Sequence, residues 1–174
     1  MKTGGLFERL RAAVDELKRV KRIGKLDLGV LRTMMMLAAV DGDISDGEIA
    51  AFKEMASGCQ GYSPESFPEL FESTLRSAGY LLVLSRFRSR DELIAAFVRE
   101  AYAPFVVPIA KEADEERRCA IGCLERMALS DGLFSPIERD CIVALSKEVE
   151  TEHDLSAAAL RAMAADCGPL TPMM

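Results

Sequence analysis

Tryptophan is absent from this chain of 174 residues, and aromatic residues make up only 6% of it. Long runs of β-branched residues are also missing, whereas the helix-favouring residues Ala, Leu, Met, Glu and Arg are plentiful. Hydrophobic residues account for 49% and charged residues for 29%, which is typical of a folded chain rather than a disordered one. The composition therefore predicts an all-α fold, and the length fits a single domain spanning residues 1–174.

The chain also lacks an apolar run long enough to cross a membrane, since the longest are Met34–Val40 and Tyr80–Leu84. The unbroken apolar segment of a signal peptide is missing too, because Glu8, Arg9 and Arg11 interrupt the N-terminal region. We therefore expect a cytoplasmic protein that does not span a membrane and whose cysteines are reduced.

The net charge of −6 is unevenly distributed, because residues 1–25 carry eight Lys or Arg against three acids. The acidic remainder argues against nucleic acid as a partner. A basic amphipathic first helix is predicted at residues 4–23, and it presents a surface for a protein partner or an anionic membrane. The same pattern is also expected of the solvated face of an ordinary core helix.

Apolar residues recur at helical spacings along the whole chain, which predicts a single bundle of about seven to eight helices. After the first helix, we expect helices at Leu28–Val40 (capped by Asp27), from Ser45 past Met55, from Pro64 or Pro68 to Ala78, from Ser89 or Asp91 to Tyr102, at Pro108–Leu129, at Pro136–Val149 and at Leu155–Ala165. Tyr80–Leu84 is interpreted as a buried helical turn or connection.

A helix–turn–helix pattern occurs twice, ninety residues apart, at 38–55 and 128–145. Each copy has an apolar helix followed by Asp-Gly, one variable residue, an apolar residue, Ser and, three residues after the Ser, Glu. Two copies predict a duplicated unit with pseudo-two-fold packing rather than a solenoid, which needs more repeats.

Most residues of each turn have a local structural explanation. Glycine after a helix end adopts the left-handed conformation at little cost. The apolar residue before the cap packs against the next helix, and Ser with Glu three residues on forms a capping box. The residues concerned are Gly42, Ile44, Ser45 and Glu48 in the first copy and Gly132, Phe134, Ser135 and Glu138 in the second.

Asp41 and Asp131 are not explained by capping, because a carboxylate at a helix C-terminus faces the negative end of the helix dipole. Either hydrogen bonds to amides across the turn or a bound cation would compensate. If the two turns lie together, Asp41, Glu48, Asp131 and Glu138 supply four carboxylates, a ligand set that suits Ca²⁺ or Mg²⁺. Asp43 is a further acid in the first copy only.

The first turn superficially resembles a calcium-binding EF-hand, because acidic or hydroxyl residues alternate at Asp41, Asp43 and Ser45. The EF-hand loop requires glycine at its sixth position and glutamate at its twelfth, where this chain has Asp46 and Phe52. The motif is therefore not an EF-hand.

The twofold Asp-Gly pattern, at Ala38–Met55 and Ala128–Leu145, resembles the TerB-like family. This family includes the tellurite-resistance protein TerB and the N-terminal domain of certain membrane-anchored J-domain co-chaperones. The resemblance implies a cytoplasmic, non-enzymatic helical bundle linked to tellurite or other chemical-stress resistance. It also implies metal binding at Asp41, Glu48, Asp131 and Glu138. Residues 57–108 lengthen the middle of the chain relative to the family.

Cysteine and histidine give weaker indications. Cys119 and Cys123 are four residues apart on one predicted helix, with Cys141 on the next, a spacing suited to a soft metal. Buried cysteines also behave as small hydrophobes, which is the simpler interpretation here.

The single histidine, His153, has no evident nucleophile beside it, so catalysis of the Ser–His or Cys–His type is weakly supported. A hydrolase that uses paired carboxylates is the least favoured alternative.

Overall fold

A computed structural model describes residues 23–132 and 134–151 of the chain. This part is helical throughout, which confirms the predicted all-α class. The main helices are α2 (Lys25–Ala39), α3 (Asp46–Gly58), α4 (Phe67–Leu84), α5 (Arg90–Ala101), α7 (Asp114–Ala128) and α8 (Pro136–Glu148). Shorter segments are the 3-10 turn η1 (Pro64–Ser66), the π-helical η2 (Tyr102–Val106) and α6 (Val107–Ile109).

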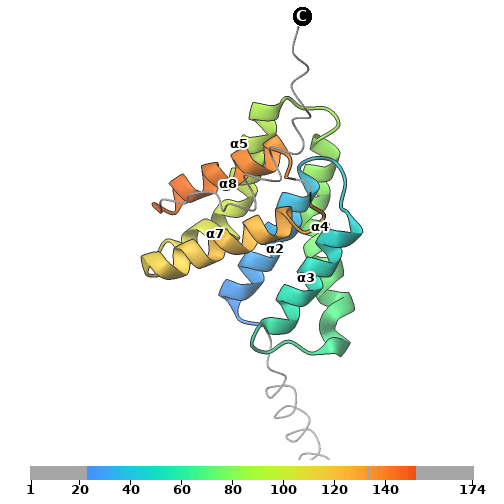
Figure 1. The fold of residues 1–174 in the computed structure, drawn as a ribbon, viewed down its shortest axis with the longest axis vertical. Helices are drawn as coiled ribbons and strands as arrows, with labels where there is room; N and C mark the ends of the chain where they lie inside the picture. Colours follow the sequence, from blue (N-terminus) through green and yellow to red (C-terminus); the bar gives the residue numbers. More distant parts are fainter. Residues whose placement is uncertain (1–22, 133, 152–174) are drawn as a thin grey trace, which may run out of the picture.

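Helix α2 is the centre of the bundle, and it contacts α3, α4, α5, α7, α8 and η2. Figure 1 shows it in the middle of the molecule between α4 and α7, with α8 beside α7. From Thr33 to its end the helix is buried on all sides, as predicted from its nearly continuous apolar sequence. Met34, Met35 and Met36 are core residues, at most 2% exposed.

Several predicted boundaries shift. Helix α2 begins at Lys25 with Gly24 as its N-cap residue, so Asp27 is not the cap. Helix α4 continues to Leu84, so Tyr80–Leu84 is helical but belongs to this helix, and Tyr80 and Val83 are exposed rather than buried as expected. The predicted helix at 155–165 and, except for its last residue, the predicted helix at 4–23 lie outside the described residues. The total of seven to eight helices therefore stays a prediction.

The predicted helix Pro108–Leu129 was wrong as one continuous element. The structure divides it into α6 and α7, with an extended residue, Ala113, before α7. The acids Asp114, Glu115 and Glu116 fill the first turn of α7, where the helix dipole favours negative charge. These three acids therefore indicate that a new helix starts at Asp114, although the residues on both sides of the break favour helix.

A close approach between backbones joins α2 to η2. A Cβ atom at position 29 would lie 1.9 Å from the carbonyl oxygen of Pro104, so only glycine is accommodated in α2 at this point. Pro104 lies inside the π-helical segment that follows α5, where the α-helical hydrogen-bond pattern cannot continue because proline has no N–H group. Gly29 therefore lets the widened turn of η2 pack directly on the central helix.

We expect Gly29→Ala to lower the free energy of unfolding by about 3 kcal/mol, because the added methyl group overlaps backbone rather than a movable side chain. Gly122→Ala is the matched control, since a Cβ atom at that position in α7 has no neighbour within 4 Å. This control should stabilise the protein by about 0.5–1 kcal/mol through helix propensity. Urea unfolding of both variants measures the difference, and equal stabilities would contradict the close contact.

Candidate functional site

The first Asp-Gly turn has the local structure that its sequence predicts. Gly42 follows the end of α2 with a φ of +96°, in the left-handed region. The Glu48 backbone N–H donates to Ser45 Oγ at 3.2 Å, and the Ser45 backbone N–H donates to Glu48 Oε2 at 2.7 Å. The capping box at the start of α3 is therefore complete.

The second turn repeats this arrangement. Gly132 has a φ of +81°, and Ser135 with Glu138 forms the capping box of α8 through hydrogen bonds of 2.8 and 3.3 Å. Phe134 is buried before the cap, and Ile44, its counterpart in the first turn, is packed against the same core. The two turns share their local chemistry, while the pseudo-two-fold packing of the repeats stays a prediction.

Asp41 is partly explained by a hydrogen bond across the turn. Its Oδ1 accepts from the Asp43 backbone N–H at 3.1 Å, which closes an Asx turn directly after α2. This was one of the two explanations that the sequence left open.

The two turns lie against each other although ninety residues separate them. A Cβ atom at Gly47, in the first turn of α3, would lie 3.1 Å from the Ser130 carbonyl oxygen and 3.2 Å from Asp131 Cα. Helix α3 also contacts α7, which leads into the second turn. Glycine at position 47 therefore lets the second acidic turn sit directly on the helix that follows the first.

Electrostatic interactions cross between the two turns: the charge of Asp131 acts on Asp41 and Glu48, and the charges of Asp41 and Glu48 act on Glu138. The pKa of Glu48 is raised to about 7, mainly by desolvation and in addition by the charges of Asp41 and Asp131, despite hydrogen bonds from Ser45 that lower it. Desolvation likewise raises the pKa of Glu138 to about 8, against the bonds from Ser135, and the charges of Asp41 and Glu48 add to the effect. The pKa of Asp41 is also raised, first by desolvation and then by Asp43 and Asp131.

The carboxylates differ in burial and do not form a ready-made ligand cage. Glu48 and Glu138 are 4% and 3% exposed, whereas Asp41 and Asp131 lie at the surface. Among residues 23–132 and 134–151, no three His, Cys, Asp or Glu side chains are arranged to hold a metal ion. The site therefore concentrates negative charge without presenting closely grouped ligands.

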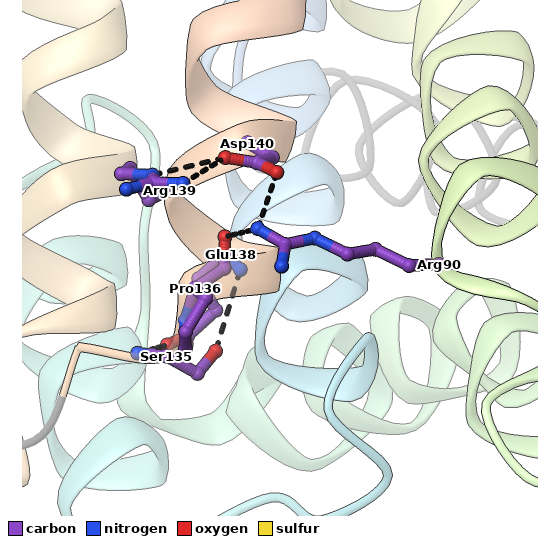
Figure 2. Close-up of polar contacts among 6 residues, drawn as sticks. All are labelled: Arg90, Ser135, Pro136, Glu138, Arg139 and Asp140. Atoms are coloured by element: carbon purple, nitrogen blue, oxygen red, sulfur yellow. Dashed lines mark hydrogen bonds and ion pairs between the residues drawn. The ribbon is translucent and has the colours of Figure 1, made fainter.

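An ion pair that the sequence analysis missed holds the second motif to α5. Arg90 pairs with Asp140 of α8 and donates to the Pro136 carbonyl oxygen at 3.1 Å, as Figure 2 shows. Partial burial acts to raise the pKa of Asp140, but hydrogen bonds and charges from Arg139 and Arg90 outweigh it, and the pKa is lowered. No local spacing signals this contact, because Arg90 and Asp140 are far apart in sequence.

The cysteines predicted as possible soft-metal ligands separate into two environments. Cys141 is buried, as expected of a small hydrophobe, but Cys119 is exposed and Cys123 is half-buried. The expectation that both helices bury their cysteines was therefore wrong for Cys119. His153 and Cys167 lie outside the described residues.

These features define the class of protein. It is an all-α domain with two Asp-Gly turns, each followed by a capping box, whose carboxylates interact electrostatically. A family model described as "Tellurite resistance protein TerB" matches residues 27–161. The chain therefore belongs to the TerB family, which confirms the resemblance found in its repeated turns. No curated protein and no solved structure matches the chain.

No helix in the described part has both the length and the apolar character needed to cross a membrane.

The raised pKa values predict that the protein loses stability as the pH rises. Glu48 and Glu138 bind protons more tightly in the folded state than at their ordinary value of 4.5 in the unfolded chain. Their contribution is fully present below that value and is lost as the pH rises through about 7 and about 8. We expect the free energy of unfolding, measured with urea, to fall between about pH 5 and about pH 9.

The variant Glu48→Gln/Glu138→Gln should flatten this profile, because glutamine keeps the capping box but does not ionise. Glu92→Gln is the matched control: Glu92 belongs to the same type of capping box, with Ser89, but is exposed, and hydrogen bonds from Ser89 lower its pKa. The control should retain the fall. Parallel profiles for the wild type and the double variant would contradict the assignment.

Proposed function

We propose that this TerB-family protein is a non-enzymatic protein of resistance to tellurite or another chemical stress, and that its two acidic turns together bind Mg²⁺ or Ca²⁺. The observation that carries the proposal is the mutual influence of Asp41, Glu48, Asp131 and Glu138, which come from two distant segments. A single turn would concentrate fewer charges and would attract a divalent ion less strongly.

The electrostatic state of the turns favours a cation. Desolvation and repulsion from neighbouring carboxylates disfavour the ionised form of each glutamate, which is why the pKa values of both are raised. A divalent ion between the turns would offset both effects and would stabilise the ionised carboxylates. Binding would then release protons from Glu48 and Glu138 near neutral pH.

The oxygens suit a hard ion even without a preformed cage. The capping boxes use Oε2 of each glutamate, so Oε1 takes no part in capping. Mg²⁺ usually keeps several of its waters and needs only one or two carboxylates from the protein. A hydrated ion therefore requires less convergence of ligands than a structural calcium site does.

We expect Mg²⁺ or Ca²⁺ to raise the thermal unfolding temperature of the wild type. At an ion concentration about 100 times the Kd, the added stability is about 2.7 kcal/mol. The variant Asp41→Asn/Asp131→Asn should lose this response, because it removes charge from both turns while leaving both capping boxes intact. Differential scanning calorimetry with each ion, and Mn²⁺ as a third, measures the effect.

Glu65→Gln/Glu69→Gln is the matched control, since it removes two negative charges from exposed positions near the start of α4. The control should respond to the ions as the wild type does. If no ion shifts the wild type, or if the control loses the response to the same extent, cation binding at the turns is wrong. The alternative of an interaction module rests mainly on basic residues 1–22, outside the described part, and it stays a prediction.

A further inference from the structure

A sulfur-lined cavity lies away from the acidic turns. It has a volume of about 490 Å³ and is enclosed by α2, α3 and α7 with Ile109 of α6. Five of its lining residues carry sulfur: Met34, Met55, Cys59, Cys119 and Cys123. Because Cys119 is exposed, the cavity is accessible from solvent on the α7 side.

The thiols of this cavity interact with one another. Cys119 and Cys123 are one turn apart on α7, and a hydrogen-bonding contact joins their side chains. Cys59, at the end of α3, lies near enough to Cys123 for their charges to influence each other. The third cysteine of the group is thus Cys59, and Cys141, which the sequence spacing suggested, is buried elsewhere, outside this cavity.

The charges around the cavity favour a cation. Four acids line it, Asp27, Glu54, Glu112 and Glu116, while Arg126 is the single basic residue among its lining. The Arg126 guanidinium donates to Cys123 Sγ at 3.4 Å, a contact that stabilises the thiolate form of this cysteine. The cavity therefore combines soft donor atoms with a net negative lining.

We propose that Cys119 and Cys123 bind a soft, low-coordinate metal ion, Cu(I), in this cavity, with the thioether sulfur of Met55 beside them. Thiolate and thioether donors select Cu(I) over hard cations. The described residues offer no group of three His, Cys, Asp or Glu arranged as metal ligands. An ion satisfied by two thiolates and a thioether is consistent with that arrangement, whereas a tetrahedral zinc site is not.

Binding displaces protons from the thiols, one from each of the two coordinating cysteines. Desolvation raises the pKa of Cys59 to about 11 and also raises the pKa of Cys123, although Arg126 acts in the opposite direction. Because Cys123 must lose its proton to bind the ion, the affinity for Cu(I) should decrease as the pH falls. No electron is transferred, because copper enters and stays as Cu(I).

The test is anaerobic titration of the reduced full-length chain with Cu(I) buffered by bicinchoninate, followed by the absorbance of the chelator complex. We expect the wild type to remove copper from the chelator. The variant Cys119→Ser/Cys123→Ser should remove one equivalent of copper per chain less than the wild type does. Cys141→Ala is the matched control, because this cysteine does not line the cavity, and it should take up copper as the wild type does. Arg126→Gln should weaken binding by about 10-fold, as expected for loss of a contact to a ligand atom.

A second measurement does not depend on the double variant remaining folded. Cu(I) should slow alkylation of Cys119 in the wild type, and the single variant Cys119→Ser, at an exposed position, should lose the extra equivalent of copper. Equal copper uptake by the wild type and Cys119→Ser, or no protection of Cys119, would overturn the proposal. Both results are independent of Mg²⁺ or Ca²⁺ binding at the acidic turns.

Discussion

The burial of α2 is the constraint on which the rest of the structure depends. From Thr33 onward this helix has no solvent-facing side, so the surrounding helices must cover it completely, and it contacts all of the other main helices. Gly29 allows η2 to approach it at backbone distance, and α7 packs along another side. Because α2 leads into the first acidic turn and α7 into the second, the packing of α7 on α2 and α3 brings the two turns together. The acidic site is thus a consequence of how the central helix is buried.

This location also explains the electrostatics of the site. The pattern Ser-x-x-Glu stands at the starts of α3, α4, α5 and α8. The copies that begin at Ser45, Ser89 and Ser135 form complete capping boxes, whereas Ser66, the N-cap residue of α4, makes no side-chain capping bond. At Ser89 the glutamate is exposed and its pKa is lowered by the capping hydrogen bonds, as an isolated cap predicts. At the two Asp-Gly turns the same hydrogen bonds are present, but desolvation and neighbouring carboxylates outweigh them. The raised pKa values of Glu48 and Glu138 therefore come from their surroundings in the bundle and not from the capping motif itself.

Features set by local interactions could be predicted from the sequence. The left-handed glycines, the serine caps and the glutamates that complete them depend on residues within one helical turn, and the all-α class follows from helical periodicity. Other features depend on tertiary contacts that no local pattern encodes. The ion pair of Arg90 with Asp140 joins segments fifty residues apart. Cys59 lies near Cys123 only because α3 packs against α7. The break before α7 was missed because every residue around it favours helix, and only the cluster of acids at 114–116 marked it.

The two copies of the motif differ at one position that decides how they meet. Gly47 in the first copy corresponds to Ile137 in the second, and only Gly47 lies against the backbone of the opposite turn. Ile137 instead packs against the hydrophobic core. A Cβ atom at position 47 would lie 3.2 Å from Asp131 Cα, so a side chain there would push the second turn slightly away from α3. The repeat thus duplicates its local chemistry, while the contact that unites the copies is made from one side only. The close spacing of the two acidic turns therefore depends on a glycine, which contributes neither charge nor side-chain hydrogen bonds to the site.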